Sequence, residues 1–495
     1  MNLRHVAFAL VLCSSSTALA QTEAAPGTLH WKHSELSPYV ESSDHELFLQ
    51  LAGRVHIDGY AFAGPGVKDY QRPDADGKGR QIGTGLKGNL AFRRFVLEVG
   101  GAYKEKWFFW IGGNFAQSTL DFNQNPQSSA MVYDGYVGYE ADPLLRIQAG
   151  QFNTPFTMEN VTSSRWLDAM ERSLTVRTLG APYNKDLGLM AWGTAPSGIF
   201  DYQLGVFGGD GMNRPSVDNR VDVMGRALVR PLASREDALA KMHVGASFRY
   251  GRRDPDYVFY DAPAMTTPGG YAYWTPVYGK GATETHVLPA NHQFAAAAEL
   301  YVPLEKFDLK SEFVYVREGR REAFVNALWD NERYGTLSGF GGYAQLSFWL
   351  MGSPRVNGHP GTYPVIKAPK VAGAASPSGL QLALRGEILR LKYDSNSGTP
   401  ELEAGFLDKE AEKITVNAYQ AALTYWATKH VRLTAEYSLY QFPGSPNSSV
   451  SRVGEFPDPG KRATNQATAP GARANAFDFS ANHFHEFGIR VGLAL

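Results

Sequence analysis

Apolar and polar residues alternate along most of the chain with a period of two. In the last segment, Phe487, Ile489, Val491, Leu493 and Leu495 fall on one side, and the residues between them are glycine, alanine or arginine. A period of two places the two sets on opposite faces of a β-strand. One face of this segment is therefore apolar, and the other is small or charged.

The same split recurs in many segments, and its details separate two fold classes. A soluble β-sandwich also alternates in this way. The segments here are about 9–12 residues long, the length that a tilted strand needs to cross a bilayer. Aromatic residues gather near segment ends, as in WFFW (107–110), which is typical of interfacial girdles. The alternation also continues to the last residue, where a soluble domain would more often fray. The pattern thus favours a membrane barrel.

The segments number sixteen, and single-chain bacterial barrels have an even number of strands. The sequence predicts an all-β fold, a transmembrane antiparallel β-barrel of about 16 strands. The expected strands are 46–63, 88–100, 105–116, 131–141, 143–152, 186–194, 199–207, 219–230, 241–250, 292–302, 306–317, 338–351, 378–393, 414–426, 430–441 and 481–495.

The links between these segments alternate in length, as the barrel requires. If the first strand starts in the periplasm, every second link should be short, and PLEK (303–306) and ATK (427–429) are examples. Long polar links such as 251–291 and 442–480 fall at the outward positions. The link 352–377 is long although its position is periplasmic, so it is either a real excursion or a miscount.

The third outward link, 153–185, contains a stretch with helical spacing at 165–174. A barrel of about 16 strands has a lumen wider than its side chains fill. We therefore expect a constriction loop at 153–185, whose helix leans on the wall with one face and meets the water path with the other. A surface helix that caps the barrel mouth is the alternative. The apolar face carries Trp166, Met170 and Leu174, and the charged face carries Arg165, Asp168 and Arg172.

The first twenty residues read as a cleavable signal peptide. Arg4 precedes a short apolar run, and Ala18-Leu19-Ala20 is a typical cleavage site. We expect 21–44 to be a periplasmic N-terminal segment and 45–495 to be the barrel. The only cysteine, Cys13, lies in the signal peptide, which leaves the mature chain without disulfides, thiolate metal sites or cysteine nucleophiles.

Composition and motifs exclude several functions. The formal net charge is −1 and no block of like charge occurs, so no nucleic-acid partner is expected. GTGLKG (83–88) fits a dinucleotide motif, but a polar stretch precedes it and a strand follows, which indicates an outer loop. His483 and His485 lack a third metal ligand nearby. With no recognisable catalytic motif, we expect no enzyme, no cofactor and no metal; an outer-membrane enzyme or a secreted β-domain is the competing class.

The stretch GQFNTPFTMENVTSSRWLDAMERSL (150–174) resembles the signature of the phosphate-selective porin O/P family. Weaker similarity continues through 53–60, 92–101, 133–152, 341–352 and 431–442. The resemblance implies a 16-stranded, trimeric outer-membrane channel for anions. It also implies a third loop folded into the pore and a ladder of arginines along the wall.

The resemblance assigns pore roles to particular residues. Arg54 and the pair Arg93-Arg94 stand where family members place pore arginines, and Asp134 in YDGY matches a recurrent acidic position. Periodicity alone directs Arg94 into the lumen and Arg93 outward, unless a bulge turns both inward.

Two departures weaken the implied phosphate specificity. Where the family often has W-x-x-K, this chain has Trp107 followed by Trp110, and Asn153 follows GQF where lysine is common. Channel architecture therefore carries over better than phosphate recognition does.

Alternation places further arginines in the lumen. The expected function is an outer-membrane porin, a passive channel that favours anions, phosphate or related oxyanions. Luminal glutamates such as Glu98 and Glu387 could pair with the arginines and leave the net sign of the lumen open. A general or sugar and mixed-solute porin with weak anion preference is therefore the alternative. Expected partners are small anions such as phosphate, outer-membrane lipids and, by resemblance, two further copies in a homotrimer of the Gram-negative outer membrane. The pore residues expected in addition to those above are Arg226, Arg249, Arg385 and Arg490.

Overall fold

The computed structural model describes residues 29–34, 37–64, 71–73, 79–81, 88–116, 131–180, 184–216, 218–254, 260–270, 272–274, 276–278, 285–324, 333–352, 360–366, 378–394, 412–443 and 483–495. The expected signal peptide (1–20) and most of the GTGLKG stretch lie outside the described residues.

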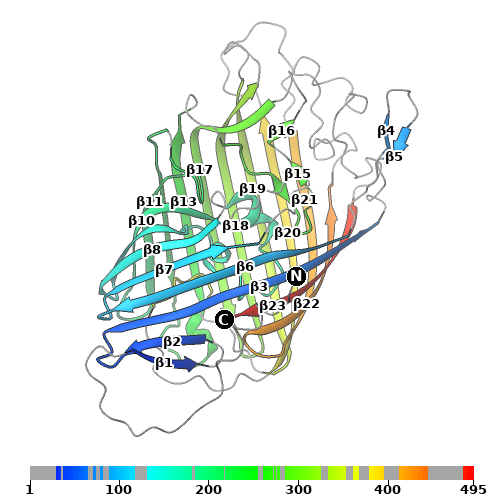
Figure 1. Cartoon of the computed structure of the whole chain (residues 1–495). Coiled ribbons are helices and arrows are strands. Elements are labelled where there is room, and N and C mark those ends of the chain that lie inside the picture. Colours follow the sequence, from blue (N-terminus) through cyan, green and yellow to red (C-terminus); the bar gives the residue numbers. More distant parts are fainter. Residues whose placement is uncertain are drawn as a thin grey trace, which may run out of the picture.

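Sixteen antiparallel strands of the described chain form one closed barrel (Figure 1), because each strand pairs with the next and the last, β23, pairs with the first, β3. The strands are β3 (Leu47–Ala63), β6 (Asn89–Tyr103), β7 (Trp107–Asn114), β8 (Met131–Asp142), β9 (Leu145–Asn153), β10 (Lys185–Thr194), β11 (Phe200–Phe207), β12 (Asp222–Val229), β13 (His243–Arg253), β17 (Thr285–Pro303), β18 (Phe307–Phe324), β19 (Arg333–Met351), β20 (Gly379–Asp394), β21 (Glu412–Trp426), β22 (Val431–Gln441) and β23 (His483–Ala494).

The predicted fold class is confirmed. Each of the sixteen expected segments overlaps one barrel strand, with the largest differences at the outer ends of β17, β18 and β19. Strands β19 and β20 pair directly from Thr336↔Asp394 to Met351↔Leu380. The long link 352–377 is therefore a real excursion at the periplasmic end and not a miscount.

The two faces of each strand differ as the alternation predicts. Phe313 and Tyr315 of β18 are 46% and 38% exposed on the outer face, whereas Glu312 is buried in the lumen. Strands β17 to β21 have 15–19 residues, and β7 and β9 to β12 have 8–10. The barrel wall is therefore taller on one side than on the other (Figure 1). Among the described helices, none is long and apolar enough to cross a membrane.

Short strands and one 3₁₀ helix lie at the two ends of the barrel. At the periplasmic end, β1 (Leu29–Ser34) and β2 (Ser37–Ser42) form a hairpin, and β2 continues the sheet by pairing with β3. The 3₁₀ helix η2 (Ala238–Lys241) lies in a periplasmic turn. The outer loops contain β4 (Gln71–Pro73), β5 (Gly79–Gln81), β14 (Met265–Thr266), β15 (Ala272–Trp274) and β16 (Val277–Tyr278).

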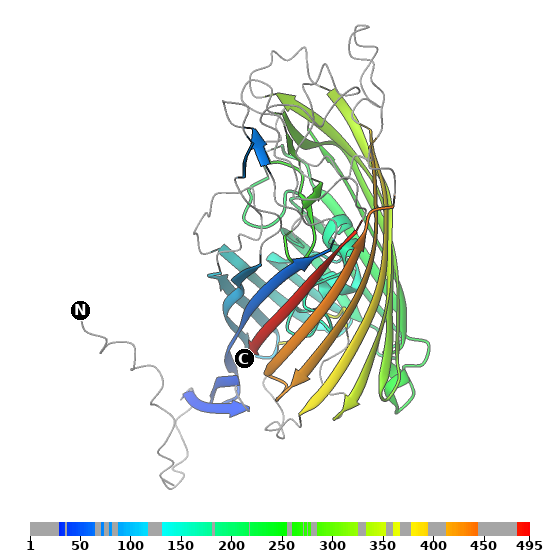
Figure 2. The same cartoon turned by 90° about the vertical axis from the view of Figure 1, so that its right-hand side faces the viewer.

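The loop 153–185 folds into the lumen, as expected, and lies inside the ring of strands in Figure 2. The prediction of a helix at 165–174 is wrong. The loop instead has two short helices, α1 (Met158–Val161) and α2 (Leu174–Leu179), with an irregular segment between them. Helix α2 begins where the predicted helix ends, after Ser173, whose side chain accepts a hydrogen bond from the Val176 N–H.

Candidate pore and its loop

Wall carboxylates explain why the 165–173 segment is not helical. The main-chain N–H of Met170 donates to Glu436 of β22 at 2.7 Å. The N–H of Thr175 donates to Glu387 of β20 at 3.3 Å. At α1, Glu312 of β18 accepts from the N–H groups of Met158 and Glu159. The Met170 contact satisfies a main-chain group that a continuous helix would pair internally. The other contacts satisfy N–H groups in the first turns of α1 and α2, which have no partner within the helix.

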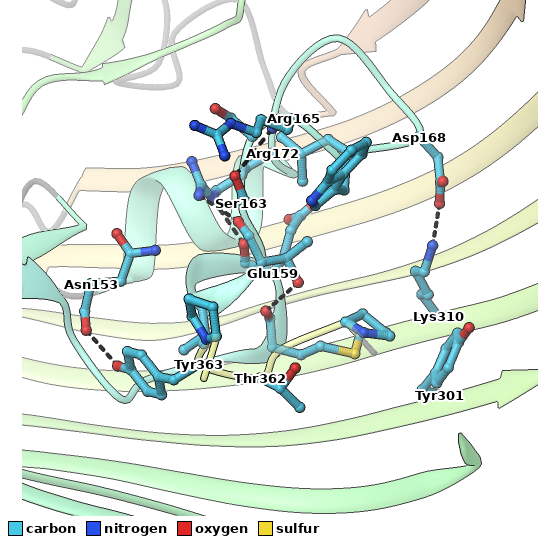
Figure 3. A pocket seen from close by; sticks show the side chains of 18 of the residues that line it. Asn153, Glu159, Ser163, Arg165, Asp168, Arg172, Tyr301, Lys310, Thr362 and Tyr363 are labelled. Carbon is cyan, nitrogen blue, oxygen red and sulfur yellow. Dashed lines mark hydrogen bonds and ion pairs between the residues drawn. The ribbon is translucent and has the colours of Figure 1, made fainter. Parts of the chain in front are cut away.

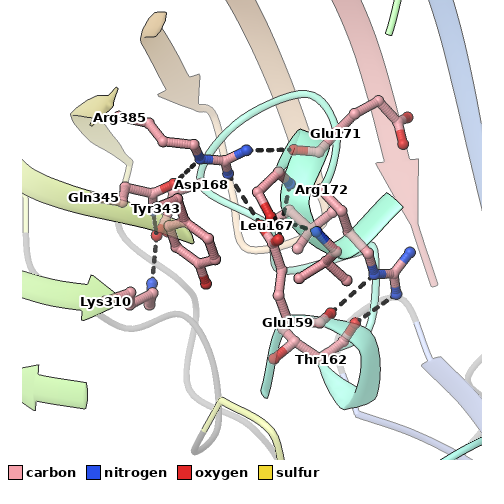
Figure 4. Close-up of polar contacts among 12 residues, drawn as sticks. Glu159, Thr162, Leu167, Asp168, Glu171, Arg172, Lys310, Tyr343, Gln345 and Arg385 are labelled. Atoms are coloured by element: carbon pink, nitrogen blue, oxygen red, sulfur yellow. Dashed lines mark hydrogen bonds and ion pairs between the residues drawn. The ribbon is translucent and has the colours of Figure 1, made fainter. Parts of the chain in front are cut away.

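Wall arginines bind the carbonyl oxygens of the same segment. Arg432 donates to the carbonyl of Leu167 at 2.9 Å and to that of Ser164 at 3.1 Å. Arg385 donates to the carbonyl of Glu171 at 3.2 Å (Figure 4). The charged wall therefore holds the main chain of the loop from both sides, which overrides the helical periodicity of its side chains.

Glu171 is the junction between the loop and the arginines of the wall. Its carboxylate accepts from Arg94 at 2.5 and 2.8 Å, from Arg93 at 3.2 Å and from Arg490 at 2.7 Å. Burial alone would raise the pKa of Glu171, but the three guanidiniums hold its pKa well below the usual value. This carboxylate is thus ionised, and it neutralises part of a dense positive cluster. Arg490 also pairs with Asp58 at 2.5 Å.

A bulge brings both arginines of the Arg93-Arg94 pair to Glu171. The register between β3 and β6 shifts where Arg94 faces His56 and Phe92 faces Ile57, so Arg93 is the extra residue. This is the exception that periodicity left open, and it turns both side chains toward the lumen.

Asp168 lies in a polar pocket of the wall. It pairs with Lys310 of β18 and accepts from Gln345, Ser347 and Gln381 at 2.7, 3.0 and 2.8 Å. Figure 4 shows the contacts with Lys310 and Gln345. Burial alone would raise the pKa of Asp168, but Lys310 and these hydrogen bonds hold it below its usual value.

The loop arginines are held in different ways. Arg165 pairs with Glu98, which also accepts from Arg54 at 3.2 Å. Arg172 instead donates to three main-chain carbonyls, those of Glu159, Asn160 and Thr162, at 2.9, 3.3 and 2.9 Å. Within the described residues, no carboxylate lies within ion-pair distance of Arg172. Its charge is therefore less compensated than that of Arg165.

A cavity of about 700 Å³ lies beneath the loop and reaches the periplasmic turns (Figure 3). The expected charged face of the loop, Arg165, Asp168 and Arg172, lines it, together with Trp166 from the expected apolar face. Among the described residues, seven cations and six carboxylates line the cavity. The cations are Arg54, Arg165, Arg172, Lys185, Lys241, Lys310 and Arg385, and the carboxylates are Glu98, Asp134, Glu159, Asp168, Glu305 and Asp308.

Residues 360–366 of the periplasmic link close part of this cavity from below. The Tyr363 hydroxyl donates to the carbonyl of Asn153 at 2.5 Å (Figure 3), and the Gly361 N–H donates to the Thr162 hydroxyl at 2.8 Å. Gly361 has φ +70, and a side chain there would meet Arg226 at 2.5 Å. The link thus meets the third loop inside the lumen.

The remaining expected pore residues also lie on the inner face, and each has a charged partner. Arg226 pairs with Glu299 at 2.6 Å, and Arg249 with Asp222 at 2.6 Å. The other pairs are Arg385 with Glu159 at 3.1 Å and Asp134 with Lys185 at 2.6 Å.

Two comparisons with known sequences bear on this geometry. The family model described as phosphate-selective porin O and P matches residues 68–441. This chain belongs to that family. It is also 26% identical over 271 residues to Porin O of Pseudomonas aeruginosa, a match that covers 53% of this chain and 54% of that protein. The chain thus spans about half the length of the curated relative that it matches.

The fold of this porin O and P family member is similar to that of solved outer-membrane barrels. OmpT of Vibrio cholerae, expressed in the outer membrane, is 9% identical, with 91% of this chain and 98% of that chain covered and a TM-score of 0.48. An anion-selective porin from Comamonas acidovorans is also 9% identical, with 91% and 100% covered and a TM-score of 0.43.

Several lining residues of this O and P family member escaped the sequence analysis. Arg432 alternates inward between Val431 and Leu433, so strict periodicity could have found it. Tyr133 could not be found in this way, because a second register shift, between β7 and β8, turns it inward beside Asp134. Lys185 shares its parity with the outward-facing Leu187 and Leu189, so alternation would have placed it outward, although it is buried. The Tyr133 ring then lies 4.8 Å from the Arg54 guanidinium and 4.3 Å from Lys185 Nζ.

Proposed function

We propose that this chain forms a passive channel for small anions, phosphate and related oxyanions, in the outer membrane of a Gram-negative cell. The family and the closed barrel with an apolar exterior support a channel and not an enzyme. The observation that carries the anion preference is the cavity lining, in which seven cations meet six carboxylates and Arg172 is held by carbonyl groups alone.

Selectivity of this kind arises from charge aimed into a narrow aqueous path. Most luminal arginines are paired, and a solvated pair contributes little net field. The preference therefore depends on the few cations that remain uncompensated. Guanidinium groups suit oxyanions in particular, because they donate two parallel hydrogen bonds to a phosphate. The pore roles of Arg54, Arg93, Arg94, Asp134 and the other residues expected from the sequence stay predictions.

The test is the reversal potential of the purified channel in a planar bilayer under a potassium chloride gradient. An anion-favouring pore gives a reversal potential with the same sign as the equilibrium potential of chloride. Added phosphate should reduce chloride conductance if oxyanions bind in the lumen. A reversal potential of the cation sign would contradict the proposal.

A general channel with weak anion preference is the second candidate. It is favoured by the near balance of charge and by the aromatic side chains of the same cavity, which could stack on sugars. In the same bilayer, a neutral sugar that blocks the ion current as strongly as phosphate does would support this candidate. The aromatic residues are Trp110, Tyr133, Tyr136, Trp166, Tyr301, Tyr343, Trp349 and Tyr363.

The family also supports an assembly of three copies. Under this proposal the constriction is the loop 153–185 of each copy, so one trimer contains three separate pores. Chemical cross-linking of the detergent-solubilised protein should give a trimer band. A monomer at every cross-linker concentration would contradict the assembly and leave the channel function intact.

A further inference from the structure

Exposed cations on the outside of the barrel gather on the outer halves of four strands of the taller wall and its edge. Among the strand residues whose burial is described, the exposed lysines and arginines are confined to β13, β18, β20 and β21. They lie on the same outer face as side chains that face lipid, such as Tyr250 and Tyr315, which are 44% and 38% exposed. We call these residues the outer basic row. It consists of Arg252, Arg317, Lys392 and Lys413.

The outer basic row lies at the level of a membrane surface. Arg317 is ten residues beyond Phe307, which starts β18 at the periplasmic end. Ten residues span about 33 Å along a strand, or about 25 Å along the membrane normal at a tilt of about 40°. The apolar band of an outer-membrane barrel is about 25 Å tall, so Arg317 emerges at its outer edge.

The strand register places two of these cations side by side. Arg317 of β18 is opposite Ser338 of β19, and Ser338 is opposite Lys392 of β20. Two strand spacings separate the backbones of Arg317 and Lys392 by about 10 Å. Both side chains can therefore reach one ligand on the outer surface.

Little negative charge offsets Arg252, Arg317 and Lys392 of the outer basic row. Lys392 lies 3.7 Å from Asp394, and that aspartate is the only carboxylate that the described residues place within ion-pair distance of Arg252, Arg317 or Lys392. On the shorter wall, Val223 faces Tyr250 across the strand pair and Val206 faces Val223. These residues lie one outward position below the level of Arg252. No exposed lysine or arginine is described in the strands of that side, so the exposed strand cations belong to one sector of the barrel.

We propose that the outer basic row docks the phosphate groups of an anionic glycolipid in the outer leaflet. The neighbouring aromatic and aliphatic side chains would contact its acyl chains, while the guanidinium of Arg317 and the ammonium of Lys392 bind phosphate. This inference rests on the placement of the barrel in an outer membrane and not on the solute that it conducts. A cation beside an anionic lipid surface increases binding about fivefold.

The test measures glycolipid binding by the purified full-length barrel. Diphosphoryl lipid A is added to the detergent-solubilised protein, and bound lipid is counted by native mass spectrometry. We expect Arg317→Gln with Lys392→Gln to lower the apparent affinity about 25-fold at low salt. The matched control is Lys106→Gln with Arg235→Gln, which removes two exposed cations from periplasmic turns and should leave binding unchanged.

Further binding measurements identify the ligand. Lipid A without its phosphates should bind the wild-type protein as weakly as diphosphoryl lipid A binds the double variant. Millimolar inorganic phosphate should not displace the lipid; full displacement would indicate a site for the free ion and overturn the docking proposal. Wild-type binding by a double variant that keeps its heat-modifiable barrel band would overturn it as well. The reversal potential should be the same in wild type and double variant, because the outer basic row does not line the lumen.

Discussion

Replacing Glu171 by glutamine tests whether paired charges limit the anion preference of the pore. The substitution keeps the size of the side chain and one acceptor oxygen for Arg94. It removes the only carboxylate that the described structure gives to both Arg93 and Arg94, while Arg490 keeps Asp58. One positive charge is thereby released in the lumen beside position 171, which is next in sequence to Arg172, a residue that lines the cavity.

The magnitude follows from Coulomb's law. A unit charge about 8 Å from a passing ion contributes about 2 kcal/mol at an effective dielectric of 20 and about 0.5 kcal/mol at 80. Screening at about 0.1 M salt halves these values, because the Debye length is about 10 Å. About 0.2–1 kcal/mol remains, which stabilises an anion and destabilises a cation. The two effects add in the ratio, so we expect Glu171→Gln to raise the anion-to-cation permeability ratio about two- to thirtyfold.

The assay is the reversal potential of single channels in a salt gradient, with conductance measured in the same records. Glu105→Gln is the control, because it removes one carboxylate from an exposed periplasmic turn and should leave the permeability ratio unchanged. An assembled Glu171→Gln channel with an unchanged ratio would refute the idea that Glu171 sets the net field. A large rise in conductance would show instead that Glu171 mainly holds the loop in place.

Three further predictions concern the wall and the loop. A cysteine at Arg54, which lines the cavity, should react with a water-soluble thiol reagent, whereas a cysteine at Val244, 52% exposed on the outer face, should stay unlabelled in the membrane; equal labelling would contradict the assigned faces. Phe313→Arg, on the lipid face of β18, should cost about 2–4 kcal/mol near mid-bilayer and lower the yield of heat-modifiable barrel, and a wild-type yield would contradict that assignment. Since the pKa values of Glu171 and Asp168 are lowered in the folded loop, their stabilising contribution is complete above their usual pKa values of about 4 and is lost only as the pH falls through the lower folded values. The conductance change that comes from these two carboxylates should therefore appear only below about pH 4; a single-channel conductance that stays constant from about pH 4 to 2 would argue against these anchors.

The direction of Arg93, which periodicity left open, and the helix expected at 165–174, which was wrong, were both decided by contacts between segments distant in the sequence. Arg93 points inward because β6 carries an extra residue against β3, and a single inserted residue leaves almost no trace in an alternating pattern. The 165–174 stretch has helical spacing, yet its main chain is bound by Glu436, Arg432 and Arg385. Local periodicity records side-chain faces, and it contains no information about such distant partners.

The sequence by itself determined the barrel, its strand number and the inward direction of most arginines. Contact with lipid imposes alternation on every spanning strand, so each strand carries its own evidence. The tertiary structure alone decided the shape of the loop and the pairing of its charges. Glu171 meets Arg94 from 77 residues away and Arg490 from 319 residues away. Such meetings depend on how the closed wall surrounds the loop, and the net charge along the pore depends on them in turn.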